Sequence, residues 1–224
     1  MEKFFLAYDE PNAEKNFQLA KEKIKDLKKI DTKMSIAQSH KHCANISDTN
    51  QFMLIDGDAV LLDDFNLFDV YKKTQERGYI YIFRARNPIN GLEYGHGGIK
   101  IFDKTLFDDQ ERIDFSTSFY GRIKIVEHVL NYHAYNSTAF HAWRTAFREC
   151  VKLASGTIKN RNIKTDEARL KIWCTESNDS PFAYESLKGA RAGEQFGREN
   201  KDNQEALKKI NDFVWLKNQY EQLD

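Results

Sequence analysis

The sequence has few cysteines, few prolines and no excess of either charge. Its three cysteines are widely separated and follow neither a zinc-ligand spacing nor the dense pattern of a disulfide-stabilised domain. Three prolines in 224 residues exclude a linker-rich chain. No apolar run approaches the length of a membrane span, and the N-terminus lacks a basic stretch followed by an apolar one. We therefore expect a cytoplasmic protein.

The charge balance is 34 basic to 34 acidic residues. Nucleic-acid-binding domains usually carry a basic excess, so the total gives that class no support. The charges are nevertheless segregated: basic residues crowd 15–33, 159–171 and 188–198, whereas aspartates gather over 56–69. Local basic faces are compatible with a neutral total, although solvated helix faces explain most of them equally well.

Strand and helix patterns alternate in the first half of the chain, which predicts an α/β sheet. The expected strands are 3–8, 51–55, 78–84, 99–102 and 123–129, and the expected helices cover about 12–27, 36–46 and 65–73. From Thr138 onward the pattern is helical to the end, with breaks expected near 155–156, 178–181 and 197.

The apolar run 52–55 ends in Asp56-Gly57-Asp58. A buried strand that brings two carboxylates to its carboxyl end, around a tight turn at Gly57, is suited to hold a divalent cation against a diphosphate. Taken alone, such a turn is also common at strand ends that bind nothing. The first strand should bring Tyr8-Asp9-Glu10 to the same sheet edge, and this convergence favours sugar-nucleotide chemistry. A nucleotide would stack on Tyr8 or bond to Asp9, for which helix N-capping is the structural alternative.

The stretch 91–98 is dense in glycine and is expected to form a loop. It is not a P-loop, because no Gly-Lys-Ser/Thr follows, and it enters a strand rather than a helix, unlike a dinucleotide motif. Gly95, Gly97 and Gly98 would let the backbone approach a ligand and offer N–H donors, with His96 set between them. A tight hairpin explains the glycines equally well.

The helix expected over 140–154 has an apolar face and a basic face. The basic face could bind phosphates or could simply be solvated; its residues are His141, Arg144, Arg148 and Lys152. Glu149 is a candidate general base for an acceptor hydroxyl, and Asp179, in a loop beside Pro181, is its rival.

Several stretches of the sequence share a likeness to one family: 5–11, 56–59, 86–90, 94–102 and 146–153, with 173–175 and 189–193 extending it towards the C-terminus. Together they resemble small glycosyltransferases encoded by tailed bacteriophages. The resemblance implies a GT-A-like (Rossmann-like) open twisted sheet flanked by helices. It assigns nucleotide-sugar binding to an α/β core over 1–137 and the completion of the acceptor cleft to a helical region over 138–224, within one compact domain.

For the donor side, the resemblance matches Asp56 and Asp58 to the family's Asp-x-Asp metal motif, with Mn²⁺ or Mg²⁺ as the cation. The donor is expected to be a nucleoside-diphosphate sugar, with a UDP-sugar as the first candidate. The expected donor-binding residues are Ala7, Tyr8, Asp9, Glu10, Asp56, Gly57, Asp58, Gly97 and Gly98. The candidate catalytic residues are Glu149, Asp179 and His96.

Members of this group attach sugars to hydroxymethylated pyrimidines in phage DNA, so the implied acceptor is DNA in a host-cell cytoplasm. Hydroxymethylcytosine is the preferred base and hydroxymethyluracil its competitor; the sugar would be glucose or a pentose such as arabinose. Contacts to DNA phosphates are expected from His141, Arg144, Arg148 and Arg191, and also from Arg161 and Lys164. The alternatives are a small-molecule, glycan or protein acceptor, and a non-catalytic module that binds DNA or protein.

Overall fold

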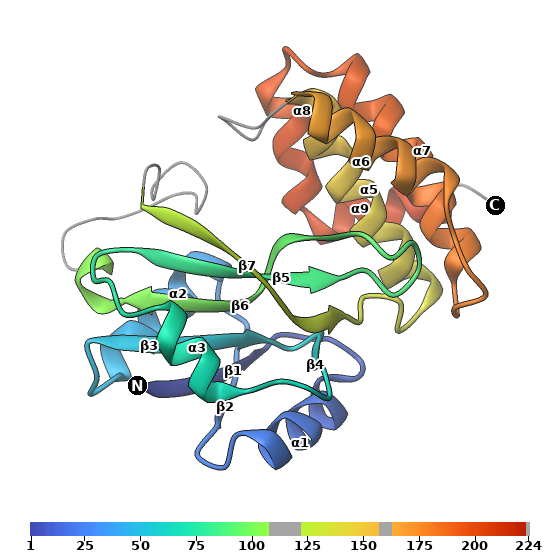
Figure 1. Cartoon of the computed structure of the whole chain (residues 1–224). Helices are drawn as coiled ribbons and strands as arrows, with labels where there is room; N and C mark the ends of the chain where they lie inside the picture. The colour runs from blue at the N-terminus through green and yellow to red at the C-terminus, as the bar shows by residue number, and fades with distance from the viewer. Residues whose placement is uncertain (108–121, 157–162, 223–224) are drawn as a thin grey trace. The chain divides into compact units, whose positions relative to one another are not determined.

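The computed structural model describes residues 1–107, 122–156 and 163–222, and Figure 1 shows the course of the chain. Strands interleaved with helices make up the described chain as far as His133, and helices follow to the C-terminus. This arrangement confirms the predicted α/β class with a mostly helical C-terminal part. Among the helices of the described residues, none is long and apolar enough to cross a membrane.

The chain divides into two compact units. The first consists of Met1–Asn87 and Glu93–Ala134, and it contains all the strands of the described residues. The second consists of Pro88–Leu92 and Tyr135–Asp224, and the regular structure of its described residues is helical. Each unit has hydrophobic cores of its own.

Seven strands of the first unit form one mixed sheet in the order β2-β1-β3-β6-β5-β7-β4. Strand β1 is parallel to β2 and β3, β6 runs antiparallel between β3 and β5, and β7 is parallel to β5 and antiparallel to β4. The carboxyl ends of β1, β3, β5 and β7 therefore meet at one edge of the sheet. The strands are Glu2–Ala7 (β1), Lys28–Asp31 (β2), Gln51–Asp56 (β3), Ala59–Leu61 (β4), Ile80–Arg86 (β5), Glu93–Asp103 (β6) and Ile123–His133 (β7).

Helices cover both faces of this sheet. They are α1 (Ala13–Lys23), α2 (Ile36–Ile46), α3 (Leu67–Lys73) and the 3-10 helix η1 (Lys104–Phe107). On one face, Phe17 of α1 and Val70 of α3 share a core with β-strand residues. On the other face, Cys43 of α2 and Leu106 of η1 do the same. Because both faces are covered, β3 needs a continuous apolar run, and residues 52–55 are fully buried.

The glycine-dense stretch is a strand, so the predicted loop over 91–98 is wrong from Glu93 onward. Its residues pair with β5 in antiparallel register, with Gly95 opposite Arg84. The glycines leave room for neighbouring side chains, since a Cβ on Gly95 would lie 2.8 Å from Ile125 Cδ1. A Cβ on Gly98 would lie 2.8 Å from Asn131 Nδ2. These contacts explain two glycines through packing within the sheet.

The second unit is built around two long helices, α5 and α7, and Figure 1 draws its helices in yellow to red. Its elements are α5 (Ala139–Ser155), α6 (Ile163–Thr175), α7 (Ala183–Glu199), α8 (Gln204–Lys208), η2 (Lys209–Asn211) and α9 (Phe213–Glu221). Thr138 caps α5 by accepting a hydrogen bond from the backbone N–H of His141. Gly156 ends α5 in the left-handed region, as the break predicted there requires.

Glycines allow α7 to lie against the backbone of α5. A Cβ on Gly189 would lie 2.9 Å from Trp143 Cα, and one on Gly193 would lie 2.8 Å from Phe147 Cα. Gly197 continues this stripe inside α7, and the helix ends two residues later at Glu199, so the break predicted near Gly197 lies just beyond that residue. The low helix propensity of glycine suggested a break, but Gly197 allows the two helices to pack closely.

Candidate functional site

The Asp-Gly-Asp turn connects β3 to β4 at the carboxyl edge of the sheet. Strand β1 is the parallel neighbour of β3, with Leu6 opposite Asp56. The segment that follows β1 therefore lies beside the turn, and the predicted convergence of 8–10 with 56–58 is confirmed.

Glu10 lies directly over Gly57. Its Oε2 accepts a hydrogen bond from the backbone N–H of Tyr8 at 2.8 Å. A Cβ on Gly57 would lie 2.6 Å from the same oxygen, so only glycine fits there without moving Glu10. The turn is also held from α1, where buried Asn16 donates from Nδ2 to the carbonyl oxygen of Gly57 at 2.9 Å.

The first carboxylate of the turn is held by a lysine from β6. Lys100 Nζ lies 2.8 Å from Oδ1 and 2.7 Å from Oδ2 of Asp56. The Lys100 side chain is only 9% exposed, whereas that of Asp56 is 31% exposed. Lys100 lies opposite Leu54 in the β3–β6 pairing, so its side chain shares a sheet face with Asp56, two residues further along β3.

The second carboxylate is held by a histidine from β7. His133 Nε2 lies 2.8 Å from Asp58 Oδ2, and the His133 side chain is 7% exposed while that of Asp58 is 27% exposed. The backbone N–H of Ala134 donates to the carbonyl oxygen of Asp58 at 2.7 Å. Both aspartates thus combine a buried basic partner with a carboxylate that still reaches solvent.

Burial and the charges of neighbouring carboxylates raise the pKa of two acids at this edge, Asp56 and Glu10. Burial raises the pKa of Asp56, Lys100 opposes that shift, and the charge of Asp58 adds to it. The pKa of Glu10 rises to about 7, mainly because its carboxyl is buried and also because Asp58 and Asp56 lie nearby. Near neutral pH, Glu10 is therefore about half protonated, which limits the negative charge collected here.

The chemistry of this donor set fits a hard divalent cation. Asp56 and Asp58 offer carboxylate oxygens from one short turn, the ligands that Mg²⁺ and Mn²⁺ prefer, and both side chains are partly exposed. Within the described residues, no group of three or more His, Cys, Asp or Glu side chains is arranged to hold a metal. A cation here would need oxygens from elsewhere, and a bound diphosphate or water could supply them.

The other donor-side residues predicted on β1 have different environments. Ala7 is buried at the end of β1. Tyr8 is half-buried, and its burial beside α2 raises its pKa to about 12. Asp9 is exposed and is not the N-cap of α1, because Asn12 occupies that position. Asp9 therefore does not occupy the N-cap position, and its contact with a nucleotide stays a prediction.

The glycine-dense strand contributes backbone at positions 97 and 98. The side chain of His96, predicted as catalytic, lies outside the described part of the structure, as does any contact made by Gly97. Gly98 is buried against Asn131, which accounts for its lack of a side chain. Packing explains Gly98, and donor binding by Gly97 and Gly98 stays a prediction.

The basic residues of α5 have partners inside the second unit. Arg148 donates from Nε to the carbonyl oxygen of Ile210 at 2.8 Å, and the Arg144 guanidinium lies 4.5 Å from the centre of the Phe213 ring. His141 Nδ1 lies 2.7 Å from Thr138 Oγ1. The predicted phosphate ladder therefore also serves to attach the C-terminal segment to α5.

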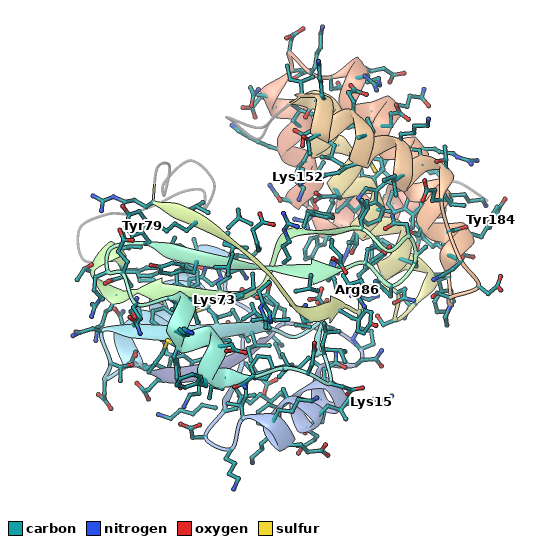
Figure 2. All side chains as sticks on the ribbon, viewed as in Figure 1. Lys15, Lys73, Tyr79, Arg86, Lys152 and Tyr184 are labelled. Carbon is teal, nitrogen blue, oxygen red and sulfur yellow. The ribbon has the colours of Figure 1, made fainter. Side chains whose placement is uncertain are left out.

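The predicted bases of the second unit differ in exposure. Glu149 is buried on α5, and its Oε2 lies 2.6 Å from Nζ of Lys152, which Figure 2 labels. Asp179 is exposed in the loop before α7. Arg191 donates from Nε to the carbonyl oxygen of Cys174 at 3.0 Å, and Arg161 lies outside the described residues.

Sequence reasoning missed Lys100, His133 and Asn16 as members of this edge. Each lies far in the sequence from its partner in the turn: the hydrogen bonds of Asn16, Lys100 and His133 span 41, 44 and 75 residues. One signal was available for Lys100, a charged residue flanked by apolar ones in an otherwise buried strand.

No protein-family model matches the chain, and no curated protein matches it. Among solved structures it is similar to HddC from Yersinia pseudotuberculosis, with 15% identity over 59% of this chain and 72% of that one, at a TM-score of 0.37. It is similar to a glycosyltransferase involved in the glycosylation of the major capsid of PBCV-1, with 10% identity over 57% of this chain and 82% of that one, at a TM-score of 0.36. It is also similar to TarS from S. aureus, with 10% identity over 89% of this chain and 74% of that one, at a TM-score of 0.41. Because all three TM-scores are below 0.5, no residue role is transferred from these proteins.

Proposed function

We propose that this chain is a glycosyltransferase that moves a sugar from a nucleoside-diphosphate sugar to an acceptor hydroxyl. One observation carries the proposal. Two adjacent carboxylates, Asp56 and Asp58, stand at the carboxyl edge of parallel strands, and each is oriented by a buried basic partner while remaining open to solvent. Ligands of open α/β sheets bind at this edge.

Asp56 and Asp58 would hold a divalent cation, Mn²⁺ or Mg²⁺. When bound, such a cation stabilises the negative charge of a departing diphosphate. Lys100 and His133 keep the two carboxylates in place, so that little ordering remains to be done when the donor binds. Tyr8 offers an aromatic ring beside the same edge for a nucleobase, and a UDP-sugar is the first donor to test.

For the acceptor, we propose 5-hydroxymethylcytosine in DNA, with glucose or a pentose such as arabinose as the transferred sugar. The support is the sequence resemblance to phage glycosyltransferases, and the balanced charge of the chain adds none. Of the two predicted acceptor bases, Asp179 is the first to test by substitution, because its side chain is exposed whereas that of Glu149 is buried beside Lys152. A base with a buried ion pair would have to break it to reach an acceptor.

The test is a transfer assay on DNA that contains 5-hydroxymethylcytosine, using a panel of nucleotide sugars with Mn²⁺ or Mg²⁺. We expect mass addition of one sugar to the modified base, lost on chelation and reduced at least a hundredfold in Asp58→Asn. The matched control is Asp48→Asn, an exposed aspartate of the loop before β3. Unchanged transfer by Asp58→Asn together with insensitivity to chelation would refute the metal role.

The acceptor is tested separately from the donor. The same enzyme is offered DNA with 5-hydroxymethyluracil, unmodified DNA, and small-molecule, glycan and protein acceptors. Transfer to free acceptors with none to DNA would reject the DNA proposal and keep the glycosyltransferase. Binding of DNA with no affinity for any nucleotide sugar would reject both and identify a binding module, whose affinity would fall steeply with salt.

A further inference from the structure

Lys100 places a fixed positive charge inside the carboxylate site. Its ammonium contacts both oxygens of Asp56, and its side chain is nearly inaccessible. A lysine is rarely buried in a central strand without a specific partner, because removing its charge from water is costly. Its partner is the residue that the proposed cation would use, so Lys100 must affect how that cation binds.

The charges at this edge leave little net attraction for a free cation. Asp56 and Asp58 contribute two negative charges, and Lys100 cancels one of them. Glu10 lies over Gly57, where its carboxyl accepts the backbone N–H of Tyr8. His133, bonded to Asp58, supplies no negative charge, and buried His40 on α2 is kept neutral by its burial and by Lys100.

We propose that Lys100 weakens the binding of a free divalent cation at Asp56 and Asp58, and thereby makes cation binding depend on a bound diphosphate. This inference rests on the proposed function, because it assigns a role to Lys100 within the same donor site. Like charges a few ångströms apart repel strongly in a partly buried site, so Lys100 opposes a lone cation. A diphosphate brings the negative charge that offsets both cations.

The coupling between cation binding and diphosphate binding acts in both directions. If a diphosphate tightens cation binding by a given factor, the cation must tighten diphosphate binding by the same factor. A site of this kind stays largely empty of metal until the nucleotide arrives, and the two then bind together. Lys100 is a positioning residue in this scheme, since it acts through Asp56 and is too buried to touch the donor.

The experiment measures Mn²⁺ binding by electron paramagnetic resonance of the free ion, with and without UDP, after protein-free titrations have fixed the affinity of Mn²⁺ for UDP itself. In the wild-type chain we expect Mn²⁺ alone to bind weakly and UDP to tighten its binding at least tenfold. In Lys100→Met, Mn²⁺ alone should bind at least tenfold more tightly than in wild type, and the effect of UDP should shrink.

Two further variants separate charge from structure. Lys100→Arg keeps the positive charge and should bind Mn²⁺ alone as weakly as wild type. Lys124→Met is the matched control, because Lys124 lies near the start of β7, at the opposite sheet edge, where it pairs with Glu76. It should leave both affinities unchanged.

The Mn²⁺ affinities of the wild type and the variants decide whether Lys100 has this role. Lys100→Met that binds free Mn²⁺ no more tightly than wild type would overturn the inference. If that variant does not fold, the wild-type titration alone decides, since equal Mn²⁺ affinity with and without UDP contradicts the coupling. Metal-dependent sugar transfer with no such coupling would reject the role of Lys100 and keep the proposed function. Coupled binding of Mn²⁺ and UDP with no transfer to any acceptor would support the role of Lys100 and reject the proposed function.

Discussion

The side chain of His133 lies within hydrogen-bond distance of the Asp58 carboxylate at the carboxyl edge of the sheet. The imidazole Nε2 of His133 lies 2.8 Å from Asp58 Oδ2, and the next residue, Ala134, donates its backbone N–H to the Asp58 carbonyl oxygen. The short strand β4 extends the same pairing, with Ala59 opposite His133. The position of Asp58 therefore depends on β7, which reaches the turn from a distant part of the sequence.

Replacing His133 should loosen Asp58 without removing it. In His133→Ala, we expect the affinity for Mn²⁺ in the presence of UDP to fall by about tenfold to a hundredfold, the usual cost of losing a partner that orients a ligand. His133→Gln, whose amide can still donate to Asp58, should lose less. Titration of both variants with Mn²⁺ in the presence of UDP measures the two affinities. Equal losses of affinity would show that the hydrogen bond from residue 133 does not orient Asp58 for the cation.

Replacing Gly57 should displace Glu10. In Gly57→Ala, the new Cβ would overlap Glu10 Oε2, so the carboxyl must swing away and give up the N–H of Tyr8. We expect the free energy of unfolding to fall by about 1–2 kcal/mol. In a Glu10→Ala background the same substitution should cost less. Urea unfolding of the four chains measures the difference, and an equal cost in both backgrounds would show that Glu10 is not the obstacle.

The raised pKa of Glu10 predicts a stability that depends on pH. In the folded chain its pKa is about 7, against an ordinary value of 4.5. Between these values the folded chain binds a proton that the unfolded chain releases, so the free energy of unfolding falls as pH rises through this window. Glu10→Gln removes that contribution, and its stability should change less between pH 5 and pH 8 than that of the wild type.

The size of this effect is about 2 kcal/mol, after allowance for the partial exposure of Glu10. Urea unfolding in metal-free buffer at the two pH values measures it, and the difference between wild type and Glu10→Gln isolates Glu10 from other titrating groups. Identical pH dependence in the two chains would show that Glu10 titrates normally.

Elements whose signal is local were predictable from the sequence. The apolar run of β3, the period of α2 and the two faces of α5 each reflect burial that their own residues specify. The convergence of Tyr8-Asp9-Glu10 with the Asp-Gly-Asp turn was predictable as well, because parallel strands share an edge.

Elements defined by distant partners were not predictable. Strands β2 and β4 are short, and β2 has exposed ends and no alternating apolar pattern, so only pairing with neighbours makes them strands. The glycines of β6 and α7 suggested a loop and a break, but they serve close packing against other segments. Lys100 and His133 reach their partners only in the folded sheet. The apolar residues on either side of Lys100 mark it as unusual, but nothing local names Asp56 as its partner, and His133 has no local signal at all.

Replacing a glycine of α7 by alanine distinguishes packing from helix propensity, because the two effects change the free energy of unfolding in opposite directions. On propensity alone, glycine to alanine within a helix stabilises by about 1 kcal/mol. A Cβ at Gly193 would instead lie 2.8 Å from Phe147 Cα and closer still to the Phe147 carbonyl oxygen, and backbone atoms cannot step aside as a side chain does. We therefore expect Gly193→Ala to lower the free energy of unfolding by about 2–3 kcal/mol.

Gly197→Ala provides the graded comparison. Its Cβ would lie 2.8 Å from the Val151 carbonyl oxygen and 3.1 Å from Val151 Cα, so α7 has less far to move at this end. We expect a smaller loss than at Gly193, where the added Cβ would lie even closer to a backbone carbonyl oxygen, that of Phe147. Urea unfolding followed by far-ultraviolet circular dichroism measures both. Stabilisation by either substitution would show that α7 does not lie against the backbone of α5 at that residue, because the gain in propensity would then meet no steric cost.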